Sequence, residues 1–99
     1  MKIITVQELK KLKDEKPDFQ LVDVREQYEF DDANLQGILI PMGEVMSRTN
    51  EIAKDKQVVV HCRSGARSAS VINALEAQGF TNLYNLQGGI MAYINEIGL

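Results

Sequence analysis

The sequence of 99 residues has the length of one small domain, and its 44% hydrophobic and 25% charged residues are close to globular averages, which excludes a disordered or fibrous chain. The formal net charge of -3 and the absence of a cluster of Lys and Arg argue against a nucleic-acid-binding surface. We therefore expect residues 1–99 to form a single domain that binds no nucleic acid.

The first residues, MKIITVQELKK, contain no apolar core long enough for a secretory signal, and no later segment is long enough to cross a bilayer. We therefore expect a cytoplasmic protein with no membrane partner. One cysteine allows no disulfide within the chain and no zinc site built from several cysteines. We expect no metal or other cofactor.

The N-terminal segment predicts a strand followed by a helix. Ile3 and Ile4 suggest a short first strand. Thr5 and Glu8 form the T-x-x-E pattern of a capping box, which predicts that a helix begins after Thr5. Pro17 marks the end of this helix.

Two apolar runs in the middle of the chain predict central strands. FQLVDV (19–24) and QVVV (57–60) are apolar or β-branched on both faces, which is typical of a parallel sheet covered by helices. Between them we expect a short helix around 26–30, a strand near 37–41 and a helical stretch around 45–53.

The last part of the chain continues this alternation. A buried helix follows the second central strand and ends at Gly79, and FTNLYNL (80–86) predicts another strand. Gly88 and Gly89 lead into a final helix. Alternating strands and helices predict a mostly parallel sheet with helices on both faces and ligands bound beyond the carboxyl ends of the strands.

The segment HCRSGARS (61–68) joins a central strand to the next helix and contains the only cysteine, Cys62. In such a loop, successive backbone N–H groups can point into one concavity at the positive end of a helix dipole. Gly65 permits a backbone angle that a side chain would oppose. The loop is therefore a candidate site for an anion.

The same loop favours ionisation of the Cys62 thiol. A helix N-terminus and the neighbouring Arg63 and Arg67 can lower a thiol pKa from about 8.5 to roughly 3.5–7.5, which produces a nucleophile at neutral pH. The alternative is that Cys62 is a small buried hydrophobe with no chemical role. For His61, we favour a packed or hydrogen-bonded side chain over a general base, because its side chain points away from that of Cys62 in an extended strand.

The sequence resembles the single-domain rhodaneses over nearly its whole length and in the expected order. The resemblance lies in four segments: LVDVREQYEF (21–30), VVVHCRSGARS (58–68), GFTNLYNLQGGI (79–90) and AYINEIGL (92–99). It implies an α/β fold, namely a rhodanese-like three-layer α/β/α domain whose five-stranded, mostly parallel sheet is flanked by helices.

The resemblance also implies roles for individual residues. Cys62 matches the catalytic cysteine that accepts a sulfane sulfur as a persulfide, and Ser68 is expected to open the following helix beside the substrate. The substrate-binding loop whose amides surround the sulfur would consist of Arg63, Ser64, Gly65, Ala66 and Arg67.

Other matched residues would support the site. Asp23 and Arg25 match a D-V-R turn that stabilises the site through hydrogen bonds and ion pairs, and Glu29 is a candidate partner of Arg25. Gly88 and Gly89 match a tight turn after the last strand.

Two segments depart from the family pattern. In ANLQGILIP (33–41), Asn34 replaces a frequent His and the strand is one residue shorter, which leaves its register open. In the last helix, Met91 and Tyr93 stand where Asp and Trp are frequent. Both departures concern the surroundings of the site rather than Cys62, so the preference for a donor or an acceptor is the property that we expect to differ.

The predicted function is a rhodanese-type sulfurtransferase that moves a sulfane sulfur from a small anionic donor such as thiosulfate to a thiol or protein acceptor through a Cys62 persulfide. One alternative is a sulfur carrier or binding module with little thiosulfate turnover. Another is a cysteine-dependent phosphatase or arsenate reductase, although those relatives have H-C-x₅-R and this chain has H-C-x₄-R. The sequence leaves the oligomeric state, the pathway and the physiological donor and acceptor open.

Overall fold

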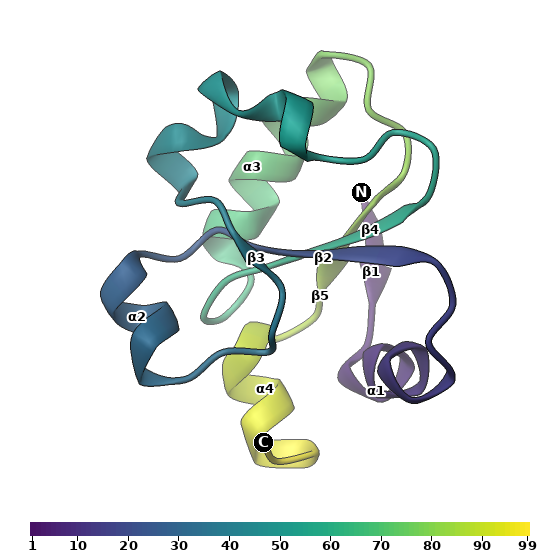
Figure 1. Cartoon of the computed structure of the whole chain (residues 1–99), viewed down its shortest axis with the longest axis vertical. Helices are drawn as coiled ribbons and strands as arrows, with labels where there is room; N and C mark the ends of the chain where they lie inside the picture. The colour runs from purple at the N-terminus through teal and green to yellow at the C-terminus, as the bar shows by residue number, and fades with distance from the viewer.

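The computed structural model describes residues 1–99 and shows an α/β fold built on one five-stranded sheet with the strand order β1-β5-β4-β2-β3 (Figure 1). Every neighbouring pair of strands is parallel. The elements in chain order are β1 (Lys2–Ile4), α1 (Val6–Glu15), β2 (Phe19–Asp23), α2 (Gln27–Asp32), β3 (Ile38–Leu39), the 3₁₀ helices η1 (Met42–Ser47) and η2 (Thr49–Glu51), β4 (Gln57–His61), α3 (Ala66–Ala77), β5 (Leu83–Leu86) and α4 (Gly89–Glu96).

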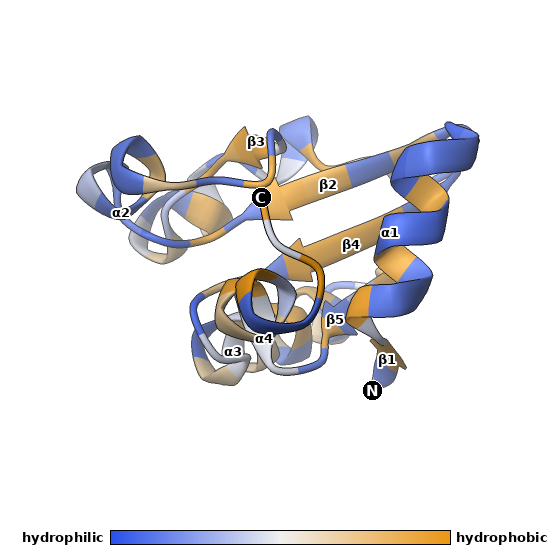
Figure 2. Ribbon diagram, turned by 90° about the horizontal axis from the view of Figure 1, so that it is seen from below, coloured by the Kyte–Doolittle hydropathy of each residue, from blue (hydrophilic) through white to orange (hydrophobic).

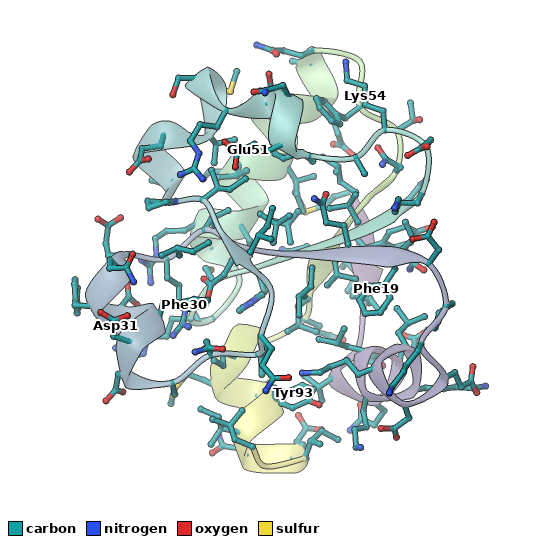
Figure 3. All side chains as sticks on the ribbon, viewed as in Figure 1. Phe19, Phe30, Asp31, Glu51, Lys54 and Tyr93 are labelled. Atoms are coloured by element: carbon teal, nitrogen blue, oxygen red, sulfur yellow. The ribbon has the colours of Figure 1, made fainter.

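Both faces of the sheet are covered, as the alternation of elements predicts. Val58 and Val60 of β4 belong to a buried cluster with α3 and η1, whereas Val59 belongs to a second cluster with α1 and α4. This division follows from the pleat, which sends successive side chains to opposite faces. Figure 2 shows the apolar central strands between the helices, and Figure 3 shows Tyr93 of α4 on the side that faces α1.

The capping box predicted at Thr5 is present. The Thr5 hydroxyl accepts a hydrogen bond from the Glu8 amide at 3.1 Å, and the Glu8 carboxylate accepts one from the Thr5 amide at 3.0 Å. These contacts satisfy two backbone donors that the first turn of α1 would otherwise leave unpaired. Lys16, in the left-handed conformation, ends the helix before Pro17.

The helical stretch predicted around 45–53 is present as two short 3₁₀ helices. η1 and η2 are separated at Arg48, whose φ of -129° is not helical. Gly43 and Asn50 are poor helix formers, and no long amphipathic face compensates for them. The predicted third strand is also short, although its register is now defined by the pairing of Val22 with Ile38.

The sheet places several polar residues at one edge. In the parallel register of β2 and β4, Asp23 lies opposite His61, and Cys62 follows directly. The loop after β4 lies next to α2 and the start of α4 (Figure 1). No helix is long and apolar enough to span a membrane.

Candidate active site

Cys62 lies at the carboxyl end of β4 with its sulfur inside the following loop. The residue is only 1% exposed. Its Sγ accepts hydrogen bonds from the amides of Gly65 at 3.1 Å and Ser68 at 3.4 Å, and it lies 3.4 Å from the Ser68 hydroxyl oxygen. The loop therefore surrounds the sulfur with donors, which is the arrangement predicted for an anion.

The turn that produces this geometry depends on Gly65. Its φ of 110° lies in the left-handed region that disfavours side chains, and it turns the amide toward the Cys62 sulfur. Gly65 is also the N-cap of α3, so the helix begins at Ala66. Ser68 thus lies within the first turn and does not open the helix as predicted. This position is what brings both its amide and its hydroxyl to the sulfur.

The pKa of the Cys62 thiol is lowered from its ordinary value. Burial acts in the opposite direction, but it is outweighed by hydrogen bonds from the Ser68 hydroxyl and from the amides of Ser68, Gly65 and Ser64. The lowering of the Cys62 pKa therefore arises from hydrogen bonds within the loop. Neither arginine of the loop donates a hydrogen bond to the sulfur.

The two loop arginines differ in their surroundings. Arg67 binds Glu29 of α2 through both nitrogens of its guanidinium fork, at 2.7 and 2.8 Å. This interaction lowers the pKa of Glu29 to about 2. Arg63 is exposed and forms no ion pair. The prediction that Glu29 pairs with Arg25 was wrong, because α2 presents this carboxylate to α3 rather than to the end of β2.

Arg25 instead binds Asp23, two residues earlier in the chain. The Asp23 carboxylate accepts hydrogen bonds from the Arg25 amide at 3.0 Å and from the guanidinium Nη2 at 2.8 Å, while Nη2 also donates to the Ala33 carbonyl at 2.7 Å. Both side chains are almost fully buried. The pair joins the end of β2 to the end of α2 beneath the site.

His61 is packed in the interior, as favoured from the sequence. It is fully buried, and neither ring nitrogen has a hydrogen-bond partner. Burial lowers the pKa of His61 to about 4, against the opposing effect of Asp23, whose carboxylate oxygen lies 3.7 Å from Nε2. The imidazole is therefore neutral at physiological pH.

The first amides of α4 donate hydrogen bonds to backbone carbonyls of the loop. The Ile90 amide donates to the Cys62 carbonyl at 2.9 Å, and the Met91 amide donates to the Arg63 carbonyl at 3.1 Å. A Cβ at Gly89 would lie 2.6 Å from the Cys62 carbonyl oxygen, so this position has no room for a side chain. Gly88 and Gly89 form the predicted turn, and Gly89 also allows the start of α4 to lie close to the backbone of the Cys62 loop.

A cleft of about 460 Å³ lies beside the loop. Tyr28 and Asp32 of α2 line one side, Met91 and Ile94 of α4 line the other, and Arg63 contributes from the loop. Met91, which stands where the family frequently has Asp, therefore lies at the rim of the site.

Asn85 of β5 is a site residue that the sequence analysis missed. Its Oδ1 lies 2.6 Å from the Ser68 hydroxyl oxygen, and its Nδ2 donates to the Gly65 carbonyl at 3.2 Å. The available signal was a polar side chain inside the apolar strand LYNL, at a register position paired with Val60 of β4.

Comparison with protein families identifies relatives of the chain. A model described as "Rhodanese-like domain" matches residues 5–96. The chain is 42% identical over 77 residues to a sulfurtransferase of Allochromatium vinosum, covering 77% of this chain and 72% of that protein. It is 36% identical over 97 residues to YtwF of Bacillus subtilis, named provisionally as a sulfurtransferase, covering 97% and 93% of the two chains.

A solved structure shares the fold. The crystal structure of a rhodanese-like domain protein from Staphylococcus aureus is 36% identical, has a TM-score of 0.86, and matches over 94% of this chain and 91% of that one. Some curated relatives are longer. The chain spans 63% of YqhL, an uncharacterized Bacillus subtilis protein, and 48% of YrkF, named provisionally as a sulfur carrier protein.

Proposed function

The chain belongs to the rhodanese-like domain family, and on that premise we propose that it is a sulfurtransferase in which Cys62 carries the sulfur as a persulfide. The observation that supports this most strongly is the position of the Cys62 sulfur, held by the amides of Gly65 and Ser68 inside the loop. Residues 1–99 would act as one domain, in a reducing compartment such as the cytoplasm that keeps the thiol free.

The first step is attack on an anionic donor such as thiosulfate. The Cys62 thiolate forms a bond to the outer sulfur, the S–S bond of thiosulfate breaks, and sulfite leaves with the electron pair. The charge then rests on the outer sulfur of the persulfide. The amides of Gly65 and Ser68, which donate to the Cys62 sulfur in this structure, are the donors available to stabilise this charge.

The second step returns the enzyme to its starting state. An acceptor thiolate attacks the outer sulfur, the persulfide S–S bond breaks, and Cys62 leaves as a thiolate. Cys62 is the only cysteine, so the persulfide has no partner in the chain with which to form a disulfide. The acceptor is therefore an external thiol or a protein.

Arg63 would attract the anionic donor. It is the loop arginine without a carboxylate partner, and it lines the cleft between α2 and α4. Glu29 occupies the Nη1–Nη2 edge of Arg67, so an anion could bind bidentately at that edge only by displacing Glu29. This commitment of Arg67 also disfavours the phosphatase and arsenate reductase alternatives, in which an arginine fork must be free to bind a tetrahedral oxyanion.

A steady-state assay tests the proposal. Thiosulfate with a thiol acceptor should yield sulfite, and Cys62→Ser should abolish sulfite release, whereas Ser70→Ala on the exposed side of α3 should leave it unchanged. Transfer from a persulfidated protein without turnover of thiosulfate would favour the sulfur carrier alternative. Cys62-dependent hydrolysis of an aryl phosphate without sulfite release would refute the proposal.

A further inference from the structure

The Ser68 hydroxyl has more acceptors than hydrogens. The residue is fully buried, and its Oγ lies 2.6 Å from Asn85 Oδ1, 3.1 Å from the Gly65 carbonyl oxygen and 3.4 Å from Cys62 Sγ. A serine hydroxyl donates only one hydrogen. Only one of these three neighbours can receive that hydrogen at a time.

The orientation of the Asn85 amide makes it a strong competitor for the hydrogen. Its Nδ2 donates to the Gly65 carbonyl at 3.2 Å, so turning the amide over would place Oδ1 against another acceptor. Oδ1 is therefore directed at Ser68. The separation of 2.6 Å is short for an O–H···O hydrogen bond and is the shortest contact that the Ser68 hydroxyl makes.

The two positions of the hydrogen have opposite effects on Cys62. When the hydrogen lies on Asn85, the Ser68 oxygen presents lone pairs to Cys62 and can accept the hydrogen of a thiol. When the hydroxyl turns to Cys62, it donates to the thiolate, and such charge-assisted bonds are stronger than neutral ones. Asn85 Oδ1 then loses its donor. We propose that Asn85 is a positioning residue that competes with the Cys62 sulfur for the single hydroxyl hydrogen of Ser68.

This inference deepens the proposed function and rests on it for its meaning in catalysis. The release of sulfur regenerates a thiolate at Cys62, and Asn85 would set how readily that thiolate is protonated. No hydrogen bond joins Asn85 to the Cys62 sulfur, so its influence passes through Ser68.

The charged side chains around the loop do not take part in the competition among Ser68, Asn85 and Cys62. None of them is hydrogen-bonded to Ser68 or Asn85: the ionisable side chains are Arg63, Arg67, Glu29, Asp23, Arg25 and His61. On the remaining neighbours, α4 carries Tyr93 and Glu96, of which Glu96 binds Gln7, and β5 carries Tyr84, which lies beneath Lys2. Met1, which carries the N-terminal amino group, contacts Asn85 Nδ2 through its sulfur at 3.8 Å. Variants at Ser68 and Asn85 leave all of these groups in place.

The test is the pH dependence of Cys62 alkylation by iodoacetamide, whose midpoint reports thiolate formation. Asn85→Ala frees the Ser68 hydroxyl to donate to the thiolate, so the midpoint should fall by about one pH unit. Ser68→Ala removes the donor, so the midpoint should rise by a similar amount. The double variant should match Ser68→Ala alone. The matched controls Asn95→Ala and Ser70→Ala, at exposed positions, should not shift the midpoint.

Opposite shifts for two residues in contact are not the result of general damage to the loop. In Asn85→Ala the Gly65 carbonyl keeps its hydrogen bond from the Ala69 amide at 3.1 Å. Asn85→Leu, which fills the space but accepts no hydrogen bond, should lower the midpoint as well and serves if the alanine variant does not fold.

An unchanged or raised midpoint in a folded Asn85 variant would overturn the inference, as would a lowered midpoint that persists in the double variant. The proposed function fails separately. If the predicted midpoints appear but thiosulfate leaves no sulfur on Cys62, the competition for the hydrogen stands and the sulfurtransferase proposal falls.

Discussion

Two arginine–carboxylate pairs flank the Cys62 loop, and they differ in burial. The Asp23–Arg25 pair beneath the loop has side chains 0% and 6% exposed, whereas the Glu29–Arg67 pair at the rim has side chains 15% and 31% exposed. The same chemical pairing therefore has two different consequences. A buried pair cannot lose one member without leaving an uncompensated charge, but water can replace a partner at the rim.

The largest effect should come from breaking the buried pair. Asp23→Ala leaves the Arg25 guanidinium without its counter-charge in the interior, and we expect a loss of about 3–5 kcal/mol in the free energy of unfolding, measured with urea. The matched control is Glu51→Ala, which breaks an exposed pair with Arg48 and should cost less than about 1 kcal/mol. Equal losses in both variants would show that burial does not distinguish the pairs.

Acid should weaken the region beneath the loop through His61. The pKa of His61 is about 4 in the folded protein against an ordinary 6.5, so the unfolded state binds more protons between these values. Stability present above pH 6.5 is therefore lost as the pH falls through this window. Urea titrations at successive pH values measure this slope.

His61 is the only histidine in the sequence, so substituting it tests whether it causes the pH dependence of the free energy of unfolding. His61→Phe keeps an aromatic ring in the interior and should flatten the dependence between pH 6.5 and 5. A slope that persists in this variant would show that another group is responsible.

The rim pair should give a smaller effect, in a lower window of pH. The pKa of Glu29 is about 2 against an ordinary 4.5, so its stabilising contribution is complete above pH 4.5 and lost as the pH falls toward 2. At neutral pH, Glu29→Gln should cost only about 1 kcal/mol, because water reaches this pair.

The same variant should change substrate binding more than stability. Releasing the Arg67 fork toward the loop should lower the KM for thiosulfate by about fivefold at low ionic strength, with less effect in high salt. Asp31→Asn, at an exposed position of the same helix and without an ion pair, is the matched control. A raised KM would mean that Glu29 positions Arg67 for the donor rather than withholding it.

The rim and the loop also differ in how far the sequence predicts them. The amide cradle around Cys62 was predictable, because Gly65 and the start of a helix are local signals within a few residues. The partner of Arg67 was not, because it depends on how α2 packs against α3, 38 residues away in sequence. Asn85 was missed for a similar reason, since strand register is needed to place β5 beside the loop.

The fold was predicted more completely than the site. The alternation of apolar strands and amphipathic helices defines the parallel sheet, and the capping box at Thr5 and the glycines at 88 and 89 define two helix starts. The helical stretch predicted over 45–53 is present as two 3₁₀ helices, because its weak helix formers leave the outcome to packing against α3.

The central claim is that Cys62 carries a sulfur atom, and intact-protein mass spectrometry tests it most directly. After incubation with thiosulfate, the mass should rise by one sulfur atom, and the gain should disappear on adding a thiol acceptor. Cys62→Ser should show no gain, while Ser70→Ala should behave as the unaltered protein. A gain that persists in Cys62→Ser, or its absence with thiosulfate and with a persulfidated protein donor alike, would contradict the account.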